Sequence, residues 1–226
     1  MQEVVLIIPT FNRPKMLQQA VDSFVMQDCD NTELLIIDDG STEMVRPCLP
    51  DNARIIRQSN QGCPAAINSG IQLSDSKLIC VLGDDDMLYN EKSLSVRVAL
   101  FDDNTDVVYT RAEEVNEAGQ HMKTLPIQPV DNKKIWRGDY INIHSMMWKR
   151  SIHNKIGYFE KDMISNEDWE FKIKCLMECS VKAADIVTVK YRWHSQNKSM
   201  INHKNGIMGQ CKEKFMERLK ERYANN

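Results

Sequence analysis

Three adjacent carboxylates, Asp84, Asp85 and Asp86, follow an apolar run at 78–82, from which only Gly83 separates them. The run lacks the alternation of a half-exposed strand, so it predicts a strand that is buried on both faces. Adjacent like charges repel one another unless a cation lies among them, and carboxylate oxygens are ligands that suit Mg²⁺ and Mn²⁺. Open α/β sheets bind their ligands beyond the carboxyl ends of the strands. The triplet therefore predicts a metal-assisted site, with a solvated acidic turn as the alternative.

Polar residues also follow three other predicted strands. The strand at 4–8 is followed by Pro9, Thr10, Phe11, Asn12 and Arg13, the one at 34–37 by Asp38, Asp39, Gly40 and Ser41, and the one at 54–57 by Gln58, Ser59, Asn60, Gln61 and Gly62. In a parallel sheet these exits share one edge, so they predict a single crevice. The sequence contains neither G-x-G-x-x-G nor G-x-x-x-x-G-K-[ST], which argues against a dinucleotide fingerprint and a P-loop. We expect Asp39 to bind a base or ribose there, and a metal to hold a diphosphate.

The spacing of apolar residues predicts the elements that position this crevice. The first half alternates strands at 4–8, 34–37, 54–57, 78–82 and 107–109 with helices at 14–25, 64–73 and 93–101. The second half is less regular, with a loop or loose hairpin at 113–134, strands at 145–148 and 186–193, a helix beginning near Asp168, and a helix at 206–223. The alternation indicates an α/β fold in which helices flank a mostly parallel sheet.

Length and composition bound the class of protein. The chain has 226 residues and a net charge of −3, which fits one domain and argues against a nucleic-acid binder. No apolar stretch approaches the roughly 20 residues that span a bilayer, and the N-terminus resembles a strand rather than a signal peptide. The seven cysteines are scattered, which is typical of reduced thiols in the cytoplasm. We expect a cytoplasmic single domain over 1–226, with a regular first half at 1–110, a less regular second half at 111–200 and a helix at 201–226.

Eight short segments follow one another in a specific order. They are 4–13 (VVLIIPTFNR), 36–41 (IIDDGS), 60–70 (NQGCPAAINSG), 83–86 (GDDD), 147–151 (MWKRS), 156–159 (IGYF), 166–170 (NEDWE) and 191–194 (YRWH). Over about residues 3–200 this set resembles the family 2 glycosyltransferases of the GT-A fold. The resemblance implies inverting transfer of a sugar from a nucleotide-diphosphate sugar, with UDP favoured, to a hydroxyl acceptor. Its setting would be bacterial polysaccharide, glycolipid or glycoconjugate synthesis, with a saccharide or lipid-linked acceptor. The resemblance further implies that 1–110 binds the nucleotide sugar and that 111–200 is the acceptor and catalytic half.

The resemblance also implies roles for individual donor-side residues. Asp39 matches the contact to the nucleotide base, and the loop that lines the nucleoside falls on Pro9, Thr10 and Phe11. We expect three further residues, Asn12, Asn60 and Asp84, on the donor side. The chain departs from the family at Gly83, where the first aspartate of the DxD motif falls, and at Ile67, where many members carry arginine.

The remaining roles concern the metal and the base. The metal-binding aspartate of DxD falls on Asp85, which we expect to hold Mn²⁺ or Mg²⁺ together with Asp86 and His194. The family's base falls on Asp168, with Glu167 as the alternative. Without the resemblance, Asp168 would be interpreted as an acid that favours the dipole at a helix start supplied by 165–166, and His194 as an ordinary polar residue at a strand end.

Three other questions stay open from the residues alone. The helix at 206–223 has an apolar face and basic residues, so it could lie on the inner face of a membrane or pack against the domain or a second subunit. His144 could reach the acceptor, and 113–134 could act as a lid. A nucleotidyltransferase or a sugar-nucleotide-binding module without turnover are the alternative functions, although the first usually has a glycine-rich loop where this chain has 9–13.

Overall fold

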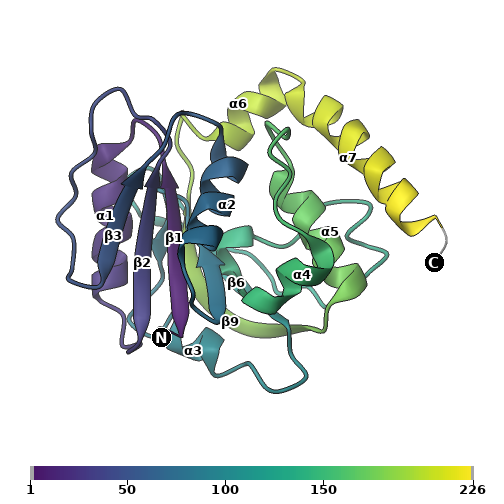
Figure 1. The fold of residues 1–226 in the computed structure, drawn as a ribbon, viewed down its shortest axis with the longest axis horizontal. Helices are drawn as coiled ribbons and strands as arrows, with labels where there is room; N and C mark the ends of the chain where they lie inside the picture. Colours follow the sequence, from purple (N-terminus) through teal and green to yellow (C-terminus); the bar gives the residue numbers. More distant parts are fainter. Residues whose placement is uncertain (1–2, 225–226) are drawn as a thin grey trace.

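The computed structural model describes residues 3–224 (Figure 1). The first half contains β1 (Val4–Thr10), α1 (Pro14–Val25), β2 (Thr32–Asp38), β3 (Ala53–Arg57), α2 (Cys63–Leu73), β4 (Leu78–Val81), β5 (Met87–Leu88), α3 (Ser95–Val98), β6 (Val107–Val115) and β7 (His121–Thr124). The second half contains the 3-10 turns η1 (Ile143–Ser145) and η2 (Arg150–Ile152), then β8 (Met146–Lys149), α4 (His153–Ile156), α5 (Glu167–Glu178), β9 (Val181–Arg192), α6 (Lys198–Lys204) and α7 (Ile207–Tyr223).

Within these described residues the strands form one sheet in the order β3-β2-β1-β4-β8-β6-β9-β5, and β7 pairs with β6. The pairs β1–β2, β1–β4, β2–β3 and β6–β9 are parallel, whereas β8 runs antiparallel to both β4 and β6. Since β1, β2 and β4 are parallel, their carboxyl ends meet at one edge. This edge carries the polar loops that we expected to form a single crevice.

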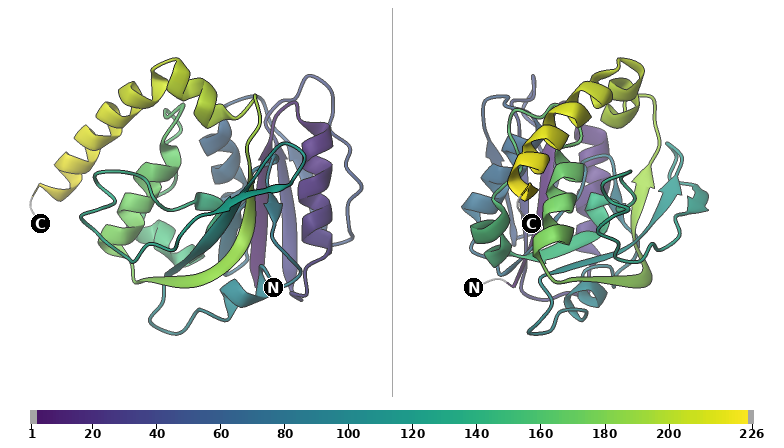
Figure 2. Two further views of the ribbon diagram at one scale, coloured as in Figure 1. Left: turned by 180° about the vertical axis from the view of Figure 1, so that it is seen from behind. Right: turned by 90° about the vertical axis from the view of Figure 1, so that its right-hand side faces the viewer.

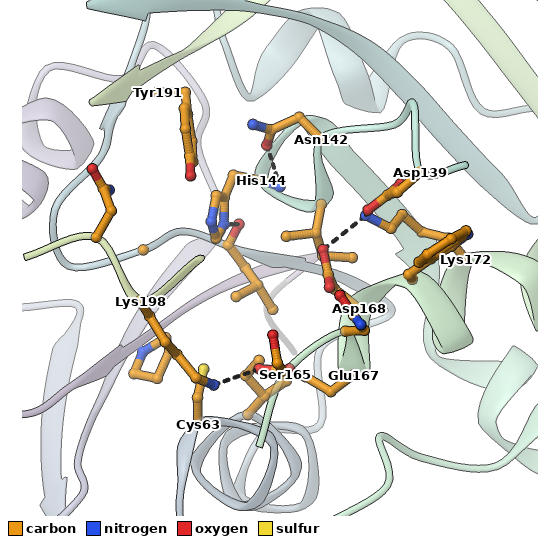
Figure 3. A pocket seen from close by; sticks show the side chains of 18 of the residues that line it. Cys63, Asp139, Asn142, His144, Ser165, Glu167, Asp168, Lys172, Tyr191 and Lys198 are labelled. Atoms are coloured by element: carbon orange, nitrogen blue, oxygen red, sulfur yellow. Dashed lines mark hydrogen bonds and ion pairs between the residues drawn. The ribbon is translucent and has the colours of Figure 1, made fainter. Parts of the chain in front are cut away.

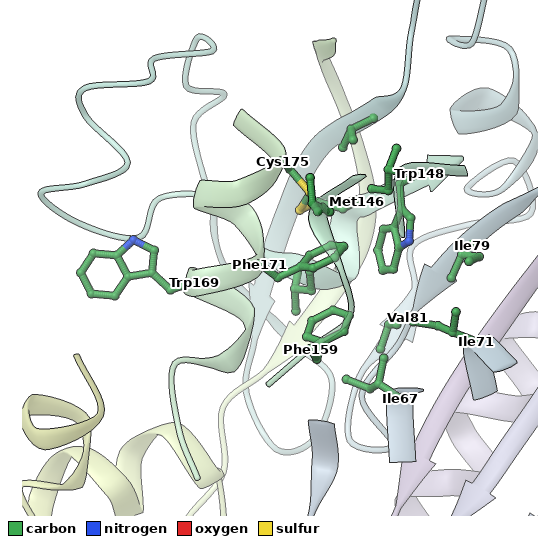
Figure 4. Packing of buried hydrophobic residues seen from close by; sticks show 14 of the residues in the cluster. Ile67, Ile71, Ile79, Val81, Met146, Trp148, Phe159, Trp169, Phe171 and Cys175 are labelled. Carbon is green, nitrogen blue, oxygen red and sulfur yellow. The ribbon is translucent and has the colours of Figure 1, made fainter. Parts of the chain in front are cut away.

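Helices cover both faces of the sheet, which explains the uninterrupted apolar strands. In β1, Val5 and Ile7 belong to the core cluster beneath α2 and α5, while Val4, Leu6 and Ile8 belong to the cluster beneath α1. Figure 2 shows α1 and α2 on opposite sides of the strands. Helix α2 lies so close to β1 that a Cβ at Gly70 would meet Ile7 Cγ2 at 2.6 Å. Figure 4 shows the aromatic part of the first cluster, where Phe159 and Phe171 stack with centroids 4.2 Å apart.

Three predicted elements differ in extent from the structure. The helix expected at 93–101 is regular only over Ser95–Val98, because Leu100 and Phe101 donate to carbonyls three residues back and tighten the end of the helix. The last strand begins at Val181 rather than 186, since its first half, which contains Lys182 and Asp185 and is only partly buried, pairs with β6 through an irregular register. The segment 113–134 starts as a hairpin of β6 and β7 and continues as loop.

The C-terminal helix α7 packs against the domain. Its apolar residues Cys211, Phe215 and Leu219 are buried, and the ring of Phe215 lies edge-on to Trp169 with centroids 5.3 Å apart. On the polar side, Arg218 contacts Asp162 and Glu170. The apolar face of α7, for which membrane contact was one of the alternatives, therefore packs against α5. None of the helices in residues 3–224 is long and apolar enough to cross a membrane.

Candidate active site

Two pockets open side by side at the carboxyl edge of the parallel strands. The first, of about 570 Å³, is lined by the start of α5, by η1 and by the 83–85 loop. The second, of about 440 Å³, lies between the loops that follow β1, β2 and β3 on one side and the segments 161–164 and 196–202 on the other. Pro9, Arg13, Cys63, Asp84 and Lys198 line both pockets. These shared residues make the two pockets one continuous site.

Asp39 organises the wall of the second pocket. The side chain is buried, and its two carboxylate oxygens accept hydrogen bonds from Gln58 Nε2, Gln61 N and Gly62 N at 2.8–2.9 Å. The loop comes this close because Gly40 adopts a φ of +82°, and a Cβ there would meet Asn60 N at 2.9 Å. Asp39 thus connects the ends of β2 and β3, and a base in this pocket would meet an aspartate that already has partners.

The other residues expected on the donor side divide into two groups. Pro9, Thr10, Phe11 and Asn60 line the second pocket, and the side chain of Phe11 is exposed. Asn12 does not line either pocket; its backbone N–H donates to Ser41 Oγ, and its Oδ1 accepts from Thr42 N. Asn12, with a φ of 58°, instead joins the loops after β1 and β2.

Arg13 connects three segments at the boundary between the pockets. Its Nη1 donates to Asp84 Oδ1 at 3.0 Å and to Asp85 Oδ2 at 2.7 Å, and its Nη2 donates to the carbonyl of Gln196. Asp84 also accepts from Thr10 Oγ1 at 2.8 Å. Burial and the neighbouring Asp85 raise the pKa of Asp84 to about 6, against the opposing effect of Arg13. The guanidinium thus offsets part of the charge of the acidic triplet.

The three aspartates of the triplet have different surroundings. Asp85 lines the first pocket, and its Oδ2 lies 3.0 Å from His194 Nε2. Asp86 lies inside the fold, where its Oδ1 accepts from Arg192 N. Its Oδ2 makes no hydrogen bond within residues 3–224 and lies 3.4 Å from His144 Nε2. Burial and Asp85 raise the pKa of Asp86 well above its usual value.

Gly83 gives Asp85 the space for its present orientation. A Cβ at position 83 would meet Asp85 Oδ1 at 2.7 Å, and would lie 3.4 Å from both Asp86 Oδ2 and His144 Nε2. An aspartate at this position, as in DxD, is therefore incompatible with the observed orientation of Asp85. Among the residues that the structure describes, no three His, Cys, Asp or Glu side chains gather closely enough to hold a metal by themselves.

Asp168 lies at the start of α5 and faces the first pocket (Figure 3). Its Oδ2 accepts from Lys172 Nζ at 2.8 Å, and the same ammonium donates to Asp139 Oδ2 and to the carbonyl of Ile141. Burial alone would raise the pKa of Asp168, but the charge and hydrogen bond of Lys172 outweigh it and lower the pKa. Asp168 is therefore an ionised carboxylate directed at the cavity.

Glu167, the alternative base, is more enclosed than Asp168. Its Oε1 accepts from Lys198 Nζ at 2.9 Å, and burial raises its pKa in spite of that lysine. Lys198 comes from α6 and brings a cation close to both pockets, near the position where Ile67 offers none. The helix start itself differs from expectation: Asn166 has a φ of 61° and makes no side-chain cap, and its amide donates to the carbonyl of Met208.

The sequence did not predict three residues that contact the expected site residues or their partners: Lys172, Arg13 and Asp139. Lys172 follows Asp168 by four residues, which is the spacing of an ion pair on a helix, so this contact had a signal. Arg13 belongs to the polar loop after β1, but nothing in the sequence pairs it with the triplet. Asp139 lies in a segment without periodicity, and its contact with Lys172 depends on the tertiary fold.

Comparisons with known proteins identify the family of the chain. The model of the family described as "Glycosyl transferase family 2" matches residues 5–157. An uncharacterized glycosyltransferase of Rickettsia felis is 27% identical over 217 residues, which cover 88% of this chain and 36% of that protein. The chain thus spans about a third of that relative. A protein of Mycobacterium tuberculosis named "PGL/p-HBAD biosynthesis glycosyltransferase" is 29% identical over 75% of this chain and 68% of its own length.

Solved structures of two other proteins share the fold. S. aureus TarS in complex with UDP-GlcNAc superposes with a TM-score of 0.72 at 18% identity, over 88% of this chain and 61% of that one. The mannosyltransferase PcManGT of Pyrobaculum calidifontis, in complex with GDP-Man and Mn²⁺, gives 0.63 at 16% identity, over 88% and 59%. The GT-A fold that the resemblance implied is confirmed. With the family model covering more than half of its length, the chain belongs to glycosyl transferase family 2.

Proposed function

We propose that this chain transfers a sugar from a nucleotide-diphosphate sugar to a hydroxyl acceptor, with inversion at the anomeric carbon and with a divalent cation. UDP is the favoured nucleotide. The solved relatives bound to UDP-GlcNAc and to GDP-Man support a nucleotide-sugar donor. The mycobacterial relative, named for PGL/p-HBAD biosynthesis, supports an acceptor that is a glycolipid or its precursor.

The observation that carries the proposal is the junction of the two pockets. The nucleoside would occupy the second pocket, between the Asp39 loop and Phe11. Its diphosphate would then lie at the shared residues Arg13 and Lys198, whose charges suit phosphate oxygens. The sugar would enter the first pocket, which Asp168 faces. This order would put the bond to be broken between Arg13 and Lys198 on one side and the Asp168 carboxylate on the other.

A pair of residues beside the junction also fits a divalent cation: Asp85, whose carboxylate accepts a hydrogen bond from Arg13, and His194. Asp85 and His194 offer a carboxylate and an imidazole whose nearest atoms lie 3.0 Å apart, and both groups bind Mn²⁺. They are too few to hold the ion without the diphosphate oxygens. Asp86 lines neither pocket, and its Oδ1 already accepts a hydrogen bond from Arg192 N, so we leave it out of the ligand set. When bound, the cation would neutralise the charge that develops on the departing diphosphate.

The protein's own groups would do the rest of the chemistry. Asp168 would accept the proton of the acceptor hydroxyl as its oxygen attacks the anomeric carbon. Arg13 and Lys198 would hold the diphosphate on the opposite side of the sugar and stabilise its charge. One displacement of this kind inverts the anomeric centre. A covalent sugar–enzyme intermediate has no role in it.

A thermal-shift panel followed by a transfer assay tests the proposal. UDP-, GDP-, dTDP- and CDP-sugars would each be added with and without Mn²⁺. We expect one nucleotide to raise the melting temperature, and more so with Mn²⁺, because the nucleotide binds only the folded state. Turnover should then release nucleoside diphosphate. Release of pyrophosphate would instead support nucleotidyl transfer, and binding without turnover on any acceptor would contradict an enzyme.

A further inference from the structure

The side chain of Lys172 is 1% exposed, although it lies beside the first pocket. Its Nζ has three acceptors: Asp139 Oδ2 at 2.5 Å, the carbonyl of Ile141 at 2.7 Å and Asp168 Oδ2 at 2.8 Å. An ammonium group has three protons, so every donor is used. Figure 3 shows Lys172 between the two carboxylates, one on α5 and one on the loop before η1.

We propose that Lys172, held by Asp139, is a positioning residue that fixes the Asp168 carboxylate toward the acceptor. This inference rests on the proposed function of Asp168 as the base. Lys172 does not need to touch a substrate for this role. It anchors Oδ2 of a side chain that is 35% exposed, and it does so from a helix position one turn away, where the backbone is rigid.

The charges of the cluster predict the direction in which the pKa of Asp168 changes when Lys172 or Asp139 is replaced. Two carboxylates share one ammonium, so Asp139 draws part of the charge of Lys172 away from Asp168. Burial raises the pKa of Asp139 to about 6, with Lys172 opposing the effect. Removing Lys172 should therefore raise the pKa of Asp168. Removing Asp139 as well should lower that pKa again, because a neighbouring negative charge is lost.

Among the described residues, four other titratable groups lie around Asp168. Glu167 precedes it on α5, His144 lies on η1, and Lys198 and the Cys63 thiol come from α6 and α2. Burial lowers the pKa of His144, so its ring is mainly neutral at pH 7. Lys198 is paired with Glu167. Of the two lysines here, Lys172 is therefore the one that contacts the base directly.

The test follows the Asp168 carboxyl carbon by ¹³C NMR, with the signal assigned by its disappearance in D168N. In the wild type and in the conservative variant K172R, the signal should stay that of a carboxylate down to pH 5. In K172M its midpoint should move upward by about one pH unit or more, since an opposite charge within contact shifts a carboxyl pKa by that much. In K172M/D139N the midpoint should fall below that of K172M.

Lys174 supplies the matched control. It is a second buried lysine on the same helix, and it pairs with Glu160 and Glu170 instead of Asp168. K174M should leave the Asp168 titration unchanged, and thermal melting would show whether either lysine variant is folded. If K172M folds and its Asp168 titrates as in the wild type, the inference is wrong. If D168N retains sugar transfer, the assignment of the base itself is wrong, whatever the titrations show.

Discussion

His194 Nε2 and Asp85 Oδ2 lie 3.0 Å apart, although 109 residues separate them in the chain. The backbone N–H of Gln196 donates to His194 Nδ1 at 3.3 Å. Nδ1 therefore acts as an acceptor, which leaves the ring proton on Nε2, facing Asp85. A cation bound by the two side chains would take the place of that proton. The same two side chains can therefore either share this hydrogen bond or bind a cation.

Asp85→Asn and His194→Ala should each remove most of the Mn²⁺-dependent rise in melting temperature that accompanies donor binding. If both side chains bind one ion, the double variant should lose little more than either single one, because contacting residues are not additive. Thermal shift with donor, with and without Mn²⁺, measures this. Fully additive losses would contradict a shared ion.

Gly83→Ala should weaken Mn²⁺ binding with little change in the free energy of unfolding. The new Cβ would lie 2.7 Å from Asp85 Oδ1, and that carboxylate can rotate away, which spoils the ligand geometry without disturbing the core. Gly209→Ala is the control, since nothing lies within 4 Å of a Cβ there. Calorimetric titration with Mn²⁺ and donor would check it. Unchanged Mn²⁺ affinity in a folded variant would count against Asp85 as a ligand.

Arg13→Ala should have opposite effects on metal and donor. Loss of the guanidinium leaves Asp84 and Asp85 without their shared partner, so Mn²⁺ should bind about tenfold tighter, the value of one hydrogen bond to a charged group. The same change removes a cation from the proposed diphosphate position, so the nucleotide should bind more weakly. Titrations of UDP into the metal-free protein, and of Mn²⁺ into the protein saturated with UDP, would show this. A parallel change in both would refute it.

Asp168→Asn should retain donor binding and lose sugar transfer by roughly 10²–10⁴-fold, the usual contribution of a general base. Asn keeps the size of the side chain and can still contact Lys172, but it cannot accept the proton. Asp185→Asn, on the exposed part of β9, is the control. Transfer rates and nucleotide affinity of both variants decide the point; equal loss of binding and transfer would give Asp168 a structural role.

Cys63 should resist alkylation although it lines both pockets. Burial raises the pKa of its thiol to about 12, so at pH 8 only roughly one molecule in ten thousand carries the reactive thiolate. Cys48, which is exposed, should react with iodoacetamide under the same conditions. Labelling of Cys63 should become measurable only as the pH rises further. Equal labelling of both at pH 8, read by peptide mass spectrometry, would contradict this environment.

The fold could be predicted from the sequence where patterns are local. The strands at 4–10, 32–38 and 78–81 are apolar runs bounded by turn residues, and the structure contains them within a few residues of the expected limits. The length of β9 was underestimated because its first half, interrupted by Lys182 and Asp185, is only partly buried and is ordered by its pairing with β6. The length of the helix at 93–101 was overestimated, since apolar spacing does not reveal that its last residues bond to carbonyls three residues back instead of four.

In the candidate site, too, only the features that follow from strand order could be predicted from the sequence. The polar ends of parallel strands predicted that Thr10, Asp39 and Asp84 would lie at one edge, because topology alone brings them there. The contacts of Asp139 with Lys172, and of Arg13 with the triplet, depend on the conformation of loops in the tertiary structure. No spacing in the sequence encodes them. Asp39 matched its family position, but only the structure reveals that backbone amides occupy its carboxylate.

A crystal structure with Mn²⁺ and an unreactive analogue of the donor would show whether one substrate spans the two pockets. We expect an arrangement with the nucleobase in the pocket beside Asp39, the diphosphate between Arg13 and Lys198, the ion against Asp85 and His194, and the sugar facing Asp168. A nucleotide bound elsewhere, or a sugar directed away from Asp168, would contradict it.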